Sequence, residues 1–324
     1  MNSSIRNIYD ILYSSGQRLP SLEKWLVQEV WSKERFEYFD SQEYLESGEK
    51  KIKAVEDLIL NAATGIYDEI VAASESSPSL LDELQSPKTA IVVFDGVSIR
   101  ELPLLEILAL KTNFSIASIR YGYAALPSDT VSYIDQRLLG KRIGPSQLRT
   151  RKEFKDRQII ARHYDTLIRH YEFPNTDSPL LLWSSFPDGT YMNFEAKSSG
   201  HFDAIMKQFD VAWKNIVLSI PRDYRIIITS DHGYVYLHAG YESELKSDKA
   251  LDVINNNRFR IFEENEDLNL TYPELQILTH KRLAMLRGRI KNRPQGSSAS
   301  KIFRHGGMSL MEMLTPDIEL QYSN

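Results

Sequence analysis

The sequence predicts an open α/β fold in which a largely parallel sheet carries helices on both faces. The first observation is a set of short runs that are apolar throughout rather than alternating, as strands buried on both faces are. These candidate strands are Ala90–Phe94, Phe114–Ile119, Leu180–Ser184 and Arg225–Thr229. The second observation is the helical pattern between them, clearest in a stripe of period 3.6 made by Ile205, Phe209, Ala212, Trp213 and Ile216. Strands that alternate with helices are typical of a doubly wound domain.

Composition agrees with a folded α/β protein and excludes several classes. The chain has 324 residues, 42% of them hydrophobic and 26% charged, which are ordinary globular values. The absence of cysteine excludes a disulfide scaffold, an iron–sulfur cluster and a cysteine nucleophile. The formal net charge of −5 gives no global attraction to nucleic acid.

The pattern of hydrophobic residues divides the chain into two regions. Residues 1–86 are patterned as helices, with Ser21 as an expected helix cap and a second helix expected over 51–73. A turn signal at Ser86-Pro87 precedes the first apolar run. We therefore expect a helical N-terminal region, 1–86, and an α/β domain, 87–324.

The N-terminus lacks the apolar stretch of a signal peptide, and no apolar run approaches the length of a spanning helix. We expect a soluble, cytoplasmic protein without membrane contact.

Acidic residues and a histidine follow three of the candidate strands. Asp95 ends the first, Asp188 follows the third, and Asp231 and His232 follow the fourth. Ligands of open α/β sheets bind beyond the carboxyl ends of the strands. An Asp-Gly alone is usually a turn, but several such groups at one edge predict a metal site. Carboxylate and imidazole ligands suit zinc or manganese.

Two further segments bring hydroxyl and imidazole groups to the same edge. The segment 125–130 follows the second strand and contains Ser128 and Thr130, either of which is a candidate nucleophile for phosphoryl transfer. Near the C-terminus, His305 precedes two glycines, and Ser309 with Glu312 has the spacing of a capping box.

The order of these motifs resembles a known family. VVFDG, LPSDT, a strand leading to PD, ITSDHG and HGGMSLMEMLTP occur in that order over roughly residues 88–318, as in the PglZ domain of the alkaline phosphatase superfamily. The resemblance implies an alkaline-phosphatase-like α/β sandwich that holds one or two metal ions, usually zinc. It further implies hydrolysis of phosphate mono- or diesters through a threonine or serine nucleophile.

The resemblance also implies roles for individual residues. Asp95, Asp231 and His232 match one metal site, beside the nucleophile. Asp188 and His305 match the other. Thr130 matches the nucleophile, with Ser128 as its nearest rival.

Two positions depart from the family pattern. The superfamily commonly has a histidine four residues after the aspartate matched by Asp188, whereas this chain has Met192. His201 is the most ligand-like substitute, with Asn193 and Asp203 as alternatives. The arginine of the N-terminal motif is displaced by two positions, to Arg100.

Two basic segments, 137–157 and 281–293, flank the expected site in sequence. Each is either a solvated helix face or a wall that binds a polyanionic substrate such as an oligonucleotide. The first leads into an expected helix over 151–171 that carries His163 and His170.

The sequence therefore predicts a metal-dependent phosphodiesterase or phosphatase acting on a phosphate ester. The resemblance implies a role in bacterial anti-phage defence of the bacteriophage-exclusion type, together with other defence proteins. The alternative is a catalytically silent scaffold subunit of a defence complex, which the departure at Met192 favours.

Overall fold

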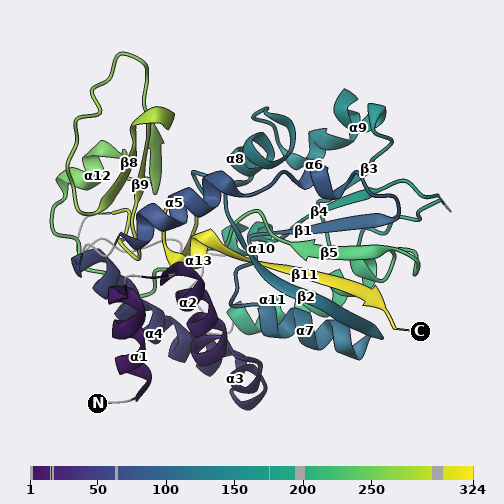
Figure 1. Ribbon diagram of the computed structural model, residues 1–324, viewed down its shortest axis with the longest axis horizontal. Helices are drawn as coiled ribbons and strands as arrows, with labels where there is room; N and C mark the ends of the chain where they lie inside the picture. Colours follow the sequence, from purple (N-terminus) through teal and green to yellow (C-terminus); the bar gives the residue numbers. More distant parts are fainter. Residues whose placement is uncertain are drawn as a thin grey trace.

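The computed structural model describes residues 3–14, 16, 18–62, 65–174, 176–193, 201–293 and 302–323. Its centre is a six-stranded sheet with the strand order β2-β11-β5-β1-β4-β3 (Figure 1). The strands are β1 (Thr89–Asp95), β2 (Phe114–Tyr123), β3 (Ile160–Tyr164), β4 (Leu180–Pro187), β5 (Arg225–Thr229) and β11 (Leu314–Tyr322). All four strands expected from the sequence are present, whereas β3 and β11 were not expected.

The sheet is mixed but mostly parallel. Strands β5, β1, β4 and β3 are parallel to one another, and β11 is antiparallel to both β5 and β2. Two antiparallel pairings in succession make β2 run in the same direction as β5. The carboxyl ends of β1, β2, β4 and β5 therefore meet at one edge, as the sequence predicts.

Helices cover both faces of the sheet, which confirms the predicted α/β class. In β1, Ala90, Val92 and Phe94 enter one apolar core, whereas Ile91 and Val93 enter the other. The first core is covered by α7 (Leu102–Lys111) and α11 (His201–Ala212, continued by Trp213–Val217), below the sheet in Figure 1. The second is covered by α6 (Leu80–Glu83), α8 (Thr130–Ile134, continued by Asp135–Leu139) and α9 (Lys152–Asp156).

Four local expectations were wrong. The single helix expected over 51–73 is divided between α4 (Ser41–Ala62) and α5 (Ile66–Ser76), because Gly65 before α5 has a φ of 74°. The helix expected over 151–171 ends after α9, because Gln158 has a φ of 56° and the chain then enters β3, which carries His163. Ser21 lies inside α2 (Arg18–Trp25) instead of capping it. Strand β2 has exposed and half-buried positions, since it lies at the edge of the sheet and is not covered on both faces.

The N-terminal helices share the first apolar core with the sheet. They are α1 (Ser3–Tyr13), α2 with its continuation Leu26–Val30, α3 (Lys33–Tyr38), α4 (Ser41–Ala62) and α5 (Ile66–Ser76). Buried side chains of α4 such as Ile52 and Val55 belong to the same core cluster as Val92. This region is therefore packed into the body of the protein.

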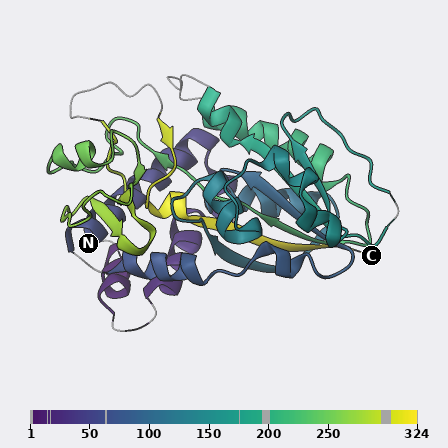
Figure 2. The same cartoon turned by 90° about the horizontal axis from the view of Figure 1, so that it is seen from above.

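A small unit between β5 and β11 was not expected from the sequence. It consists of α12 (Lys249–Val253) and the antiparallel sheet β7-β9-β8, formed by Phe259–Ile261, Leu283–Leu286 and Leu275–Leu278, around its own apolar core. The short pair β6 (Val235–Tyr236) and β10 (Phe303–Arg304) lies beside it in sequence. Figures 1 and 2 both place this unit with the N-terminal helices at one end of the molecule. The remaining short helices are α10 (Asp188–Asn193), α13 (Leu310–Met313), Pro145–Thr150 and Thr279–Lys281.

Fully buried ion pairs connect α4 to the rest of the protein. Glu49 is paired with Arg100, which follows β1, and with Arg289, whose guanidinium lies 2.7 Å away. Glu56, one helical turn further on, lies 3.8 Å from Arg289. Arg100 also lies over the rings of Trp31 and Tyr234. The displaced motif arginine is thus part of this structural network.

We expect Glu49→Ala to destabilise the protein by about 3–5 kcal/mol, because two buried guanidinium groups each lose their nearest carboxylate. Urea unfolding followed by circular dichroism measures the effect. Glu46→Ala, at an exposed position of the same helix, is the control and should change stability by less than about 0.5 kcal/mol. Equal effects of the two variants would contradict this account of the network.

Candidate metal centre

The carboxyl ends of the neighbouring strands β1 and β5 deliver the first group of polar side chains. Asp95 is the last residue of β1, and Asp231 and His232 follow β5. One ligand atom from each lies within 4.8 Å of the others. The turn after Asp95 depends on Gly96, which has a φ of 83° and would place a Cβ 3.0 Å from that of Asp188. The backbone thus allows two strand ends to approach closely.

Asp231 is fixed by three hydrogen bonds. Its Oδ1 accepts the backbone N–H groups of Gly96, at 3.2 Å, and His232, at 3.0 Å. Its Oδ2 accepts the hydroxyl of Thr130 at 2.6 Å. The carboxylate is fully buried, so its orientation is set by these donors.

His232 has one ring nitrogen bonded and the other unbonded. Its Nδ1 lies 2.9 Å from the carbonyl oxygen of Gly233 and donates to it. Its Nε2 lies 3.4 Å from Asp95 Oδ1 and 3.7 Å from Asp231 Oδ2. That nitrogen is buried and, among the described residues, has no hydrogen-bond partner. A histidine that donates from Nδ1 to a carbonyl and has Nε2 among carboxylates has the arrangement of a metal ligand, which binds once Nε2 has lost its proton.

A second cluster shares His232. It consists of Asp188, His232 and His305, again with ligand atoms within 4.8 Å of one another. His305 stacks on His232 with ring centroids 4.2 Å apart. Its Nε2 lies 3.7 Å from Asp188, and its Nδ1 lies 3.2 Å from the carbonyl oxygen of Ser128.

The carboxylates repel one another at this edge. Burial, together with the charges of Asp231 and Asp188, raises the pKa of Asp95 well above its usual range. Burial opposes charging of His232, but the same carboxylates outweigh it and raise the pKa of His232 to about 9. Burial and the neighbouring His232 lower the pKa of His305. The carboxylates therefore favour an added positive charge at this site, either as protons on these groups or as a bound cation.

The two candidate nucleophiles have different surroundings. Thr130, the first residue of α8, donates to Asp231, and its hydroxyl lies 3.4 Å from both carboxylate oxygens of Asp95. Ser128 is fully buried, donates to the carbonyl of Gly307 at 2.8 Å and accepts the N–H of Gly306 at 3.0 Å. Thr130 thus contacts the acidic cluster, whereas the hydroxyl of Ser128 tethers the glycine loop that carries His305.

That glycine loop is held by a buried ion pair that the sequence did not reveal. Arg258 makes two bonds of 2.6 Å to the carboxylate of Glu312. Glu312 in turn accepts the N–H groups of Gly307 and Ser309, both at 2.9 Å, and forms the predicted capping box with Ser309. The pair spans two distant segments, so no local pattern marks Arg258.

The expected substitutes for the missing histidine do not join either cluster of the described residues. His201 begins α11 and packs against the rings of Tyr191 and Phe303. Asp203 lies 2.5 Å from Lys207, an ion pair within one helix. The side chains of Met192 and Asn193 lie outside the described residues.

The residues present fit a divalent metal ion. Two carboxylates and an imidazole in a buried cluster are a donor set for zinc or manganese. Two observations indicate such an ion. A bound cation would give the unbonded Nε2 of His232 a partner, and it would lower the pKa of Asp95, which is raised in its absence.

Several arginines of the two basic segments form hydrogen bonds within the protein or are buried in it. Arg137 donates to the carbonyls of Ser74 and Ser77. In the segment 281–293, which forms β9 and not the expected helix face, Arg282 donates to carbonyls, Arg287 to Gln276, and Arg289 is fully buried.

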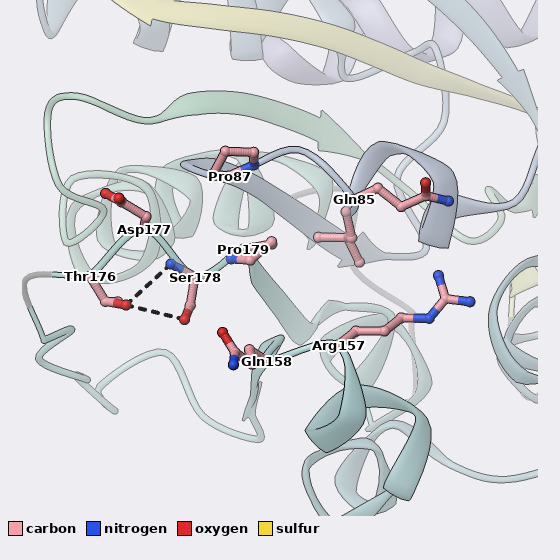
Figure 3. Close-up of a pocket in the computed structure, with 9 residues that line it drawn as sticks. Gln85, Pro87, Arg157, Gln158, Thr176, Asp177, Ser178 and Pro179 are labelled. Atoms are coloured by element: carbon pink, nitrogen blue, oxygen red, sulfur yellow. Dashed lines mark hydrogen bonds between the residues drawn. The ribbon is translucent and has the colours of Figure 1, made fainter.

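One pocket lies at the amino edge of the sheet, and another lies beside His305. Figure 3 shows one of ≈ 460 Å³ whose lining includes Pro87, Gln158 and Pro179, residues just before or near the starts of β1, β3 and β4. It therefore lies at the amino edge, away from the acidic cluster. A second pocket, of ≈ 400 Å³, is lined by His305 and adjoins the candidate site.

The chain matches no protein-family model and no curated protein. Among solved structures it is similar to murine ectonucleotide pyrophosphatase/phosphodiesterase 5, with a TM-score of 0.45 and 13% identity over 72% of this chain and 88% of that chain. An inactive form of the same murine protein, in complex with AMP, gives a TM-score of 0.44 and 11% identity over the same shares of the two chains. We draw no inference about this chain from likenesses of this size.

Within the described part of the chain, no helix has the length and apolar character needed to cross a membrane.

We expect zinc or manganese to stabilise the protein through this cluster. At a free concentration of 100 times Kd, a bound ion adds about 2.7 kcal/mol to the free energy of unfolding. Asp95→Asn should remove most of this gain while leaving the metal-free protein no less stable than wild type, because it relieves the repulsion described above. Urea unfolding with and without metal measures both.

Asp210→Ala, an exposed change on α11, is the control and should keep the full metal effect. An equal gain in Asp95→Asn would place the ion elsewhere.

Proposed function

We propose that this protein is a metal-dependent phosphoric ester hydrolase of the alkaline phosphatase superfamily, with Thr130 as its nucleophile. The observation that carries the proposal is the position of the Thr130 hydroxyl. It lies 2.6 Å from Asp231 and 3.4 Å from Asp95, inside the cluster whose donors fit a metal ion. A hydroxyl beside a metal site at the carboxyl edge of an α/β sheet is the arrangement that nucleophilic phosphoryl transfer needs.

The residues of the chain have separate roles in this proposal. Asp231 Oδ2 accepts the hydroxyl proton of Thr130 and so directs an oxygen lone pair towards the phosphorus. Attack forms a bond from Thr130 Oγ to phosphorus as the bond to the leaving oxygen breaks. Water then attacks the phosphothreonine, which releases the phosphate product and restores the hydroxyl. Asp188 and His305, which form the second cluster with His232, position the leaving group in this proposal.

The metal ion, when bound, lowers the pKa of the nucleophile and neutralises charge on the phosphoryl oxygens. Zinc is the proposed ion, with manganese as the alternative, and one or two ions are held by Asp95, Asp231, His232, Asp188 and His305.

The order of motifs supports assignment to the PglZ type, with 87–324 as that domain and 1–86 as a helical region packed into the same core. A cytoplasmic location, partners in anti-phage defence and an oligonucleotide substrate stay predictions from the sequence. The silent-scaffold alternative is not favoured, because a scaffold has no need of the repelling carboxylates around an unbonded His232 nitrogen.

We expect Thr130→Val to lower kcat for bis(p-nitrophenyl) phosphate by about 10³-fold or more, because it removes the attacking oxygen and keeps the volume. Thr130→Ser keeps a hydroxyl and should retain measurable turnover. The assay follows nitrophenolate release in zinc and in manganese, with EDTA as the metal-free control.

Ser128→Ala tests the rival nucleophile. It should cost stability, about 1–3 kcal/mol for the loop contacts of a buried hydroxyl, but retain metal-dependent turnover. If Ser128→Ala abolishes turnover and Thr130→Val does not, the roles assigned here are reversed.

A further inference from the structure

The pocket beside His305 has walls that come from the small unit between β5 and β11. Its volume is ≈ 400 Å³, and its lining runs from Ile254 to Ile261 and includes Asn292, Arg304 and His305. Because His305 both lines this pocket and belongs to the second cluster, the pocket adjoins the candidate metal centre.

Three arginines line the pocket, and two of them are already neutralised. Arg258 is paired with Glu312 and donates to the carbonyls of Gly288 and Ile290. Arg260 is paired with Glu266 and donates to the carbonyl of Val253. Both guanidinium charges are therefore already balanced by a glutamate.

Arg304 differs from both. Among the described residues its side chain has no hydrogen bond or ion pair, and its Nε is buried. The charged side chains that act on it, Arg293 and Arg258, are both positive. A half-buried guanidinium among like charges is unfavourable unless an anion joins it.

Arg304 lies close to the candidate metal ligands in the fold. Its backbone pairs with Val235, three residues after His232. Thr130 lies in the cluster of Asp95 and Asp231, whereas His305 lies in the other cluster. In-line displacement places the leaving oxygen opposite the attacking one. With Thr130 in the first cluster, we assign the leaving group to the side of the second cluster, whose His305 also lines the pocket with Arg304.

We infer that this pocket is an anion subsite in which Arg304 binds a second phosphate, carried by the leaving group of the substrate. The inference rests on the proposed function and deepens it. The preferred substrates have a phosphate beyond the scissile one, either in a phosphoanhydride or at the next position of an oligonucleotide. The bond that breaks joins the attacked phosphorus to the leaving oxygen, and the leaving group departs with the electron pair and its own phosphate.

Binding of inorganic phosphate to the metal-free protein of 324 residues tests the subsite without catalysis. The acidic cluster repels phosphate when metal is absent, so calorimetry reports the pocket. We expect Arg304→Gln to weaken binding about tenfold and Arg304→Lys to weaken it less. Arg157→Gln, at an exposed position beside the other pocket (Figure 3), should match wild type. Equal Kd in wild type and Arg304→Gln, or no binding to wild type, overturns the subsite.

Activity then distinguishes the source of the second phosphate. A nucleoside triphosphate and a dinucleotide bearing a phosphate on its leaving nucleoside are compared with bis(p-nitrophenyl) phosphate, which has none. Arg304→Gln should lower kcat/KM about tenfold for whichever phosphate-bearing substrate is used, and leave the aryl diester unchanged. An equal loss on all three substrates overturns the inference.

The results distinguish a failure of the proposed function from a failure of the subsite. If no substrate turns over in any metal while phosphate binding still depends on Arg304, the subsite stands and the hydrolase does not. If metal-dependent turnover is present but phosphate binding ignores Arg304, the hydrolase stands and the subsite does not.

Discussion

Mutual repulsion between Asp95, Asp231 and Asp188 is the constraint on which the rest of this structure depends. The sheet brings their carboxyl groups to one buried edge, where the charges of its neighbours and burial raise the pKa of Asp95. A protein tolerates such a group only if its backbone prevents the carboxylates from moving apart. Here the restraint comes from the N–H donors to Asp231 and from the close turn at Gly96. The edge is thus strained electrostatically in a way that a divalent cation relieves.

Buried ion pairs hold the segments that carry the site. Arg258 and Glu312 fix the glycine loop before α13, and through it His305. Glu49 of α4 pairs with Arg100, just after β1, and with Arg289, just after β9. Removing one member of a buried ion pair lowers the free energy of unfolding by far more than the intact pair contributes to it. The N-terminal helices and the small unit are therefore both required to hold the segments around the cluster in place. The N-terminal region is therefore structural support for the site, whatever else it binds.

The parts of this fold that the sequence could predict are those with local causes. An apolar run followed by Asp-Gly marks β1, and Ser309 with Glu312 marks the cap of α13, because each signal lies within a few residues. Strand β3 was mistaken for helix, since only the positive φ of Gln158 interrupts the helical pattern. The sequence does not reveal the roles of Arg258, Arg289 and Arg304, because the role of a guanidinium depends on which carboxylate, distant in sequence, it contacts in the fold. Arg289 meets one, whereas Arg304 meets none among the residues that the structure describes.

The shared histidine limits how the cluster can hold metal. His232 donates from Nδ1 to the carbonyl of Gly233, so only its Nε2 is free to bind an ion. That nitrogen can serve one cluster at a time. If it joins Asp95 and Asp231, three side chains of the chain hold the first ion, and Asp188 and His305 are left as two ligands for a second. A histidine four residues after Asp188 would supply the third, but that position is Met192. The described donors therefore supply three side-chain ligands for an ion beside Thr130 and two for a second ion.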